Sequence, residues 1–183
     1  SLDGTLVYLT NYKSEKIKLK IVDNSENLGF PIAINQGINE ATGEYIIIVN
    51  NDIVVTDGWL ERMIEVAESD TEIGLVGPIS NEVSGLQIDK EAKYTTLDEM
   101  HSYAADVAVK NKGQVFHFPR IAFLCTLIKR EVIEKIGGLD ERFTPGNYED
   151  DDGIYEDDEG YDEDDDAKQG AAVAAAAAAA AAA

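Results

Sequence analysis

Residues 43–52 read GEYIIIVNND, a short hydrophobic run that ends in two amides and a carboxylate. The run follows a glycine and is rich in β-branched residues, which predicts a strand buried on both faces of a parallel sheet. Ligands of open α/β sheets bind just beyond the carboxyl ends of the strands, and Asn50, Asn51 and Asp52 occupy that place. The Asp52 carboxylate is a hard oxygen ligand, suited to Mg²⁺ or Mn²⁺ holding a diphosphate. Asn and Asp also favour simple turns, so a strand that merely ends in a turn is the alternative.

Helices and strands are predicted to alternate on both sides of this strand. The helices are expected over residues 4–14, from Pro31 to a stop at Gly43, and over 58–68, 97–110 and 131–136; the strands over 16–22, 45–49, 73–76, 115–118 and 122–128. Residues 79–93 show no period and are expected to form a long surface loop. The alternation predicts an α/β protein with a mainly parallel, Rossmann-like sheet flanked by helices. Such a domain normally begins with a strand-helix-strand unit, and the chain as given is expected to lack it.

The charge is unevenly distributed along the 183 residues, whose formal net charge is −21. Thirteen of the 36 acidic residues lie between Glu149 and Asp166, so residues 1–148 are only mildly acidic. An acidic balance argues against nucleic-acid binding, which needs a basic face. We expect one domain over residues 1–152, followed by an acidic, low-complexity and alanine-rich tail over 153–183 that is solvated and has little to pack with.

The single cysteine, Cys125, lies in an apolar run. It excludes an intramolecular disulfide, and we expect it to act as a small buried hydrophobic residue. The sequence contains no signal peptide and no apolar run long enough to span a membrane. These features predict a cytoplasmic protein, or one attached peripherally to a membrane.

Four groups of short motifs occur in order along the chain. They are NLGF and NQGI within residues 27–38, ATGEYI at 41–46, NND at 50–52, and IGGLDERF at 136–143 followed by PGNYEDDD at 145–152. In this order and spacing they strongly resemble the family-2 glycosyltransferases, which are inverting, metal-dependent enzymes of GT-A fold. The resemblance covers about residues 1–152. The segment VGPISN at 76–81 is similar to the rhamnosyltransferase-like branch of that family.

The resemblance implies a role for each matching position. Asp52 corresponds to the metal ligand of the Asp-x-Asp-type motif, with Asn50 where a first Asp often stands. Glu149 and Asp150 match the acidic pair near the acceptor site, with Asp150 as the general base; the start of a solvated acidic tail is the alternative for this pair. The positions implied to bind the nucleotide sugar are Asn27, Gly29, Asn35, Asn50 and Asn51.

The resemblance implies transfer of a sugar from a UDP- or dTDP-linked donor to an acceptor hydroxyl. An inverting transfer needs a base for the acceptor proton, which a positioned carboxylate can be. It also needs positive charge for the departing diphosphate, which Mg²⁺ or Mn²⁺ can supply. The acceptor is expected to be a saccharide, a lipid-linked sugar or a protein, in polysaccharide or glycoconjugate synthesis.

The sequence departs from the family pattern at both ends. The first strand-helix-strand unit, which carries the nucleotide-base contacts, has no counterpart, and an acidic run stands where relatives continue with an arginine-containing helix. Two other functions therefore stay open. One is a sugar-1-phosphate nucleotidyltransferase, which would want a glycine-rich basic loop near the front. The other is a non-catalytic acidic module that collects cations or basic partners.

Overall fold

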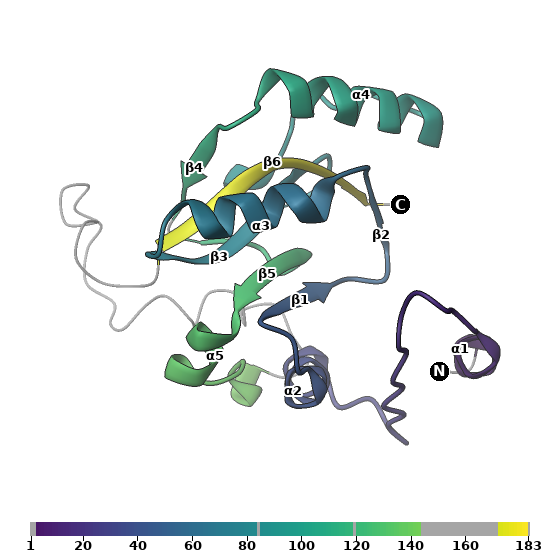
Figure 1. Ribbon diagram of the computed structural model, residues 1–183. Coiled ribbons are helices and arrows are strands. Elements are labelled where there is room, and N and C mark those ends of the chain that lie inside the picture. Colours follow the sequence, from purple (N-terminus) through teal and green to yellow (C-terminus); the bar gives the residue numbers. More distant parts are fainter. Residues whose placement is uncertain (1–2, 84, 119, 144–171, 183) are drawn as a thin grey trace.

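The computed structural model describes residues 3–83, 85–118, 120–143 and 172–182. A six-stranded sheet forms the centre of this part of the chain, in the order β1-β5-β3-β6-β2, with β4 also paired to β6 (Figure 1). The strands are β1 (Tyr45–Val49), β2 (Ile53–Val55), β3 (Ile73–Ser80), β4 (Val115–His117), β5 (Cys125–Lys129) and β6 (Ala172–Ala182).

The sheet is mixed, which corrects the prediction of a mainly parallel one. β5 lies between β1 and β3 and is antiparallel to both, so β1 and β3 run in the same direction but are not paired with each other. β3 and β6 form a parallel pair, while β2 and β4 are antiparallel to β6. The helix-connected crossover from β1 to β3 is the parallel unit that the alternation predicted. Side-chain patterns do not reveal that a later strand, β5, is inserted between these two strands and runs in the opposite direction.

Five α-helices and two short 3₁₀ helices accompany the described strands. They are α1 (Thr5–Asn11), α2 (Phe30–Glu40), α3 (Trp59–Ser69), α4 (Leu97–Lys110), α5 (Arg130–Ile136), η1 (Gly85–Gln87) and η2 (Glu141–Phe143). Helix α3 packs on β3 and β6, α4 on β6, and α5 on β5, while α2 lies near β1 and α5 (Figure 1). No helix in the described ranges is long and apolar enough to cross a bilayer.

Helix α4 begins where the sequence predicts. Thr96 is its N-cap and forms a capping box with Glu99, because each side chain bonds to the other residue's backbone N–H. The pKa of Glu99 is lowered, chiefly by the hydrogen bond from the Thr95 backbone N–H. The structure thus confirms the helix predicted over residues 97–110, and a local cap fixes where it begins.

The alanine run does not behave as predicted. Residues 172–182 form β6, whose backbone pairs with β3, β2 and β4, rather than a segment without partners. Pairing of this kind uses main-chain N–H and C=O groups, which every alanine possesses. Composition therefore could not reveal it. The acidic residues 153–166 lie outside the described residues, and the boundary at residue 153 stays a prediction.

The predicted strand over residues 16–22 is also wrong. These residues are exposed and have no regular secondary structure, although lysine and apolar residues alternate along them. Alternation favours a strand only where a neighbouring strand offers its hydrogen-bonding groups, and no described strand pairs with this segment. The predicted loop over 79–93 is shorter than expected, because β3 continues to Ser80 and η1 follows.

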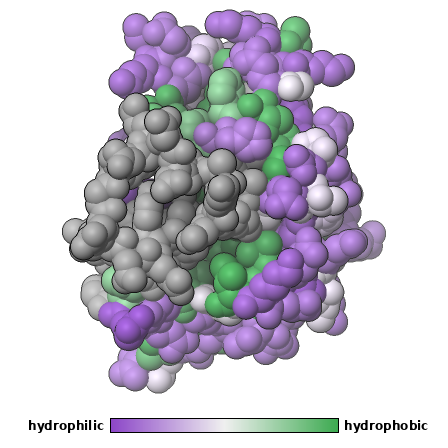
Figure 2. All heavy atoms as spheres, turned by 90° about the vertical axis from the view of Figure 1, so that its left-hand side faces the viewer, coloured by the Kyte–Doolittle hydropathy of each residue, from purple (hydrophilic) through white to green (hydrophobic). Residues whose placement is uncertain are grey.

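The main core lies between α3 and the strands β3 and β5. Its fully buried members include Met63, Val76, Cys125 and Leu127. A second cluster of Ile48, Ile128 and Val132 lies between β1, β5 and α5. Figure 2 shows one face of the molecule, on which hydrophilic side chains predominate and hydrophobic ones gather in patches.

Strand β1 is less buried than the sequence predicts. Ile46 and Ile48 are buried, Tyr45 and Ile47 are half-buried, and Val49 is 46% exposed. β1 ends the strand order of the described sheet, whereas four of the five β5 residues are buried. A strand at the end of the sheet, such as β1, and an inner strand, such as β5, can both have a continuous apolar sequence, so the sequence does not distinguish them.

Burial of Cys125 makes the stability of the fold sensitive to alkaline pH. Burial raises the pKa of the thiol from 9.0 to about 11. Because the thiol pKa is higher in the folded state than in the unfolded state, its contribution to stability is complete below pH 9, the unfolded pKa. This contribution is lost as the pH rises from 9 towards 11. We expect the free energy of unfolding to fall by about 1 kcal/mol per pH unit in this window. Urea titrations of the wild type and of Cys125→Ala across this pH window measure the free energy of unfolding, and the difference between the two pH profiles gives the contribution of the thiol. Identical pH profiles would contradict it.

Candidate functional site

The candidate site begins at the carboxyl end of β1. Val49 pairs with Cys125, and the Asn50 N–H donates to the Leu124 carbonyl oxygen at 2.9 Å. Asn51 and Asp52 then form the turn into β2, with both side chains exposed. Leu124, the residue before β5, therefore holds the base of this turn, and the Asn51 and Asp52 side chains beyond it are exposed.

The geometry of Asp52 fits a metal that binds together with a diphosphate. Its carboxylate is exposed, and within the described ranges no group of three or more His, Cys, Asp or Glu residues could hold a metal ion. Mg²⁺ is commonly held by one or two carboxylates together with substrate phosphates and water, rather than by a cage of protein ligands. A single exposed carboxylate at the strand end is compatible with that mode of binding.

The loop before α2 contains two of the predicted binding residues. The Asn27 Oδ1 accepts a hydrogen bond from the Gly29 N–H at 2.9 Å, which closes a small turn. Gly29 is the N-cap of α2 with φ 84°, a left-handed value that favours glycine. The next residue, Phe30, packs on the cluster that contains Ile48. This contact brings the start of α2 towards the carboxyl half of β1.

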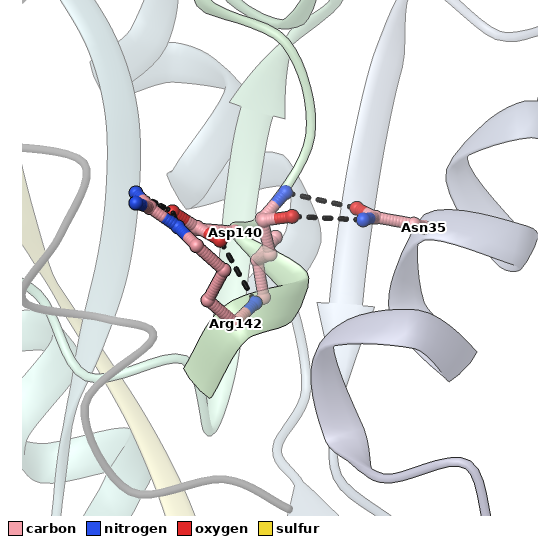
Figure 3. A network of polar contacts seen from close by, with 4 residues as sticks. Asn35, Asp140 and Arg142 are labelled. Atoms are coloured by element: carbon pink, nitrogen blue, oxygen red, sulfur yellow. Dashed lines mark hydrogen bonds and ion pairs between the residues drawn. The ribbon is translucent and has the colours of Figure 1, made fainter. Parts of the chain in front are cut away.

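The structure places Asn35 away from this loop. The Asn35 Nδ2 donates to the Leu139 carbonyl oxygen at 2.8 Å, and the Leu139 N–H donates to the Asn35 Oδ1, also at 2.8 Å (Figure 3). The same Nδ2 lies 3.0 Å from the Glu141 Oε1. Asn35 thus joins α2 to the turn that follows α5.

That turn, residues 139–143, is braced internally. The Arg142 Nε donates to the Asp140 Oδ2 at 2.7 Å, and the Arg142 N–H donates to the Asp140 Oδ1 at 2.8 Å (Figure 3). The proposed base Asp150 and its neighbour Glu149 lie outside the described residues. Their placement relative to Asp52 stays a prediction.

Two residues that position the strands were missed by the sequence analysis. Gln87 is 2% exposed; its Nε2 donates to the Pro78 carbonyl oxygen at 2.9 Å, and its Oε1 accepts from the Ala122 N–H at 2.7 Å. Arg130 donates from its Nε to the Gly43 carbonyl oxygen at 2.6 Å, which holds the loop before β1. A polar residue in a loop gives no sign of burial by its type, so no signal in the sequence could have identified Gln87.

A tyrosine pair fixes the segment after η1 to α4. The Tyr103 hydroxyl donates to the Asp89 Oδ2 at 2.8 Å, and the rings of Tyr103 and Tyr94 lie 5.9 Å apart between centroids. Burial, followed by the hydrogen bond to Asp89, raises the pKa of Tyr103 to about 12. The hydroxyl is therefore protonated at neutral pH and acts as a donor that ties the two segments together.

The chain matches a known family over most of its length. The profile of "Glycosyl transferase family 2" matches residues 1–137. An "Uncharacterized glycosyltransferase" of Haemophilus influenzae is 29% identical over 77 residues, which cover 42% of this chain and 24% of that protein. The chain therefore spans about a quarter of this curated relative.

Two solved structures share the fold. One is the mannosyltransferase PcManGT from Pyrobaculum calidifontis in complex with GDP-Man and Mn²⁺, with a TM-score of 0.50 and 20% identity over 77% of this chain and 36% of that one. The other is GalNAc-T7 with UDP, GalNAc and Mn²⁺, with a TM-score of 0.57 and 16% identity over 87% of this chain and 31% of that one. These similarities confirm the predicted α/β fold of GT-A type.

Proposed function

We propose, from the premise that this chain belongs to glycosyl transferase family 2, that it transfers a sugar from a nucleotide-diphosphate sugar to an acceptor hydroxyl with inversion. The observation that supports this most directly is the turn of Asn50, Asn51 and Asp52 at the carboxyl end of β1. Its base is held by the hydrogen bond to Leu124, and the Asp52 carboxylate is exposed. The family match makes a nucleotidyltransferase or a non-catalytic acidic module less fitting.

Asp52 would hold Mg²⁺ or Mn²⁺, which would neutralise charge on the departing nucleoside diphosphate. Mn²⁺ is present in both solved structures of similar fold. Asn50 and Asn51 directly precede Asp52 and can donate amide hydrogen bonds to phosphate oxygens. We propose that Asn27 and Gly29, in the turn before α2, lie on the donor side of the same site.

Asp150 is proposed as the general base, with Glu149 beside it in the sequence. The base removes the proton of the acceptor hydroxyl as that oxygen attacks the anomeric carbon, on the face opposite the leaving diphosphate. Such assistance contributes on the order of 10²–10⁴-fold to the rate. The support for these two residues is their place in the motif PGNYEDDD.

The finer details of the reaction are proposals of the same kind. The motif VGPISN favours the rhamnosyltransferase-like branch and hence a dTDP- or UDP-linked donor. We propose a saccharide, lipid-linked or protein acceptor, a part in polysaccharide or glycoconjugate synthesis, and a cytoplasmic or membrane-peripheral location. The solved structures contain GDP-Man and UDP, so the nucleotide is best identified by comparing all three bases.

Nucleotide binding can be tested by thermal shift on the full-length protein. UDP, dTDP and GDP are each added with and without Mn²⁺, and the matching monophosphates serve as controls that lack the second phosphate. We expect one diphosphate to raise the melting temperature only with Mn²⁺, because a ligand at a hundred times its Kd stabilises the native state by about 2.7 kcal/mol. Absence of a shift with every diphosphate, or equal shifts without metal, would argue against the proposed function.

A further inference from the structure

The Asn35 side chain pairs with the Leu139 backbone as a second peptide group would. Its amide nitrogen donates to the Leu139 carbonyl oxygen, and its amide oxygen accepts from the Leu139 N–H, both at 2.8 Å. Two opposed bonds of this kind fix the distance and the orientation of the two groups together. They connect residues 104 positions apart in the sequence.

The fit around this pair is close. An added Cβ at Gly138 would lie 2.2 Å from the Asn35 Oδ1, so any side chain at this position would push the Asn35 amide away from Leu139. Gly137 before it has φ 89°, which favours glycine. The two consecutive glycines therefore allow the backbone to approach the Asn35 amide, which gives the motif IGGLD a physical purpose that its resemblance to a family does not explain.

The contact also locates the residues that follow Leu139. The Leu139 side chain packs on the cluster of Ile48, Ile128 and Val132, which lies between β1, β5 and α5. The Asn35 Nδ2 also reaches the Glu141 Oε1 at 3.0 Å. Figure 3 shows the Asn35 amide directed at this turn from α2.

We propose that Asn35 is a positioning residue that holds the turn 139–143, and that it does not bind the nucleotide sugar. The Asn35 Oδ1 accepts from Leu139, and the Nδ2 reaches both the Leu139 oxygen and Glu141, so the amide is already engaged. This assignment replaces the nucleotide-pocket role that the sequence resemblance implied. Its catalytic consequence rests on the proposed function, since the proposed base Asp150 follows this turn closely in the sequence.

The first test measures the contact itself. Hydrogen exchange of the Leu139 amide is followed in the full-length protein, with Asn35→Ala, Asn35→Asp and the control Asn39→Ala, which removes an exposed amide from the same helix. We expect at least a tenfold loss of Leu139 protection in Asn35→Ala and none in the control, while amides in β5 keep theirs. Asn35→Asp keeps an oxygen that accepts from the Leu139 N–H but loses the donor to the Leu139 carbonyl oxygen, so we expect its Leu139 protection to lie between those of Asn35→Ala and the wild type. Unchanged Leu139 protection in Asn35→Ala would overturn the proposal.

The second test separates positioning from nucleotide binding. In Asn35→Ala we expect kcat for sugar transfer to fall at least tenfold, with the donor KM and the affinity for UDP, dTDP or GDP with Mn²⁺ unchanged within twofold. A merely structural role would lower all rates with the folded fraction and leave kcat per folded molecule intact, which would overturn positioning. A parallel loss of nucleotide affinity would also overturn it. If the wild type shows no transfer or nucleotide binding, the proposed function fails, and the exchange of Leu139 still decides whether Asn35 holds the turn.

Discussion

Replacing Asp52 by alanine is expected to lower Mn²⁺-dependent sugar transfer by about 10²–10³-fold, the range found when one group that stabilises transition-state charge is removed. The effect should come from the metal, because the exposed side chain has little to lose in stability. Asp52→Asn should behave similarly, since an amide keeps the shape and loses the charge that a divalent ion requires. Transfer rates at saturating Mn²⁺, with the melting temperature measured beside them, check both variants.

The matched control for this prediction is Asp57→Ala. Asp57 is also exposed and lies shortly after Asp52, beyond β2, at the start of α3. The Asp57→Ala substitution removes one negative charge close to Asp52 in the sequence but leaves the turn of Asn51 and Asp52 unchanged. We therefore expect a transfer rate within about twofold of wild type, as for other surface substitutions. If Asp52→Ala retains normal metal-dependent transfer, or if Asp57→Ala loses it equally, Asp52 is not the metal ligand.

The local features of the fold could be predicted because their causes are local. The start of α4 follows from the Thr96 and Glu99 capping pair, and β1 follows from the apolar run that ends at Val49. A turn at Asn51 and Asp52 is the alternative that the same residues favour, because Asn and Asp are common in turns. Each of these signals lies within a few residues of the feature that it determines.

The errors concern pairing between distant segments. The sequence predicted a strand over residues 16–22 and an unpacked alanine run over 172–182, whereas only the second forms a strand. Side-chain patterns report which face of a segment is buried, and they say nothing of which backbone groups will be available beside it. The antiparallel insertion of β5 between β1 and β3 also depends on pairing between distant segments, which side-chain patterns do not report.

The site shows the same division between local and distant information. Asn27 and Gly29 interact within their own loop, as adjacent residues in a motif suggest. Asn35 belongs to the same stretch of sequence, yet its partner is Leu139. A family motif assigns one role to residues that are close in the sequence. A side chain whose partner is far away in the sequence can have a different role. The contact with Leu139 distinguishes Asn35 from Asn27 and Gly29, which we propose lie on the donor side of the site.

Replacing Leu127 by alanine is the substitution from which we expect the largest loss of stability. Leu127 is fully buried at the centre of β5, where it pairs with Ile47 on one side and Val76 on the other. Buried Leu→Ala changes cost about 2–5 kcal/mol, a large part of the roughly 5–15 kcal/mol that stabilises a typical domain. Urea unfolding followed by circular dichroism measures the loss, and Leu86→Ala, at a side chain that is 72% exposed, is the matched control with an expected change within about 0.5 kcal/mol.

The same variant tests whether β5 supports the site through β1. The hydrogen bond that fixes Asn50 is made to Leu124, immediately before β5 begins. If loss of the Leu127 side chain only lowers the folded fraction, transfer per folded molecule should stay at the wild-type level, and Mn²⁺ with the nucleoside diphosphate should restore part of the melting temperature because the ligand binds only the native state. If transfer per folded molecule falls as well, the packing of β5 also sets the position of the Asp52 turn. Equal effects of Leu127→Ala and Leu86→Ala on the free energy of unfolding would contradict the prediction that the buried Leu127 side chain carries a large share of the stability.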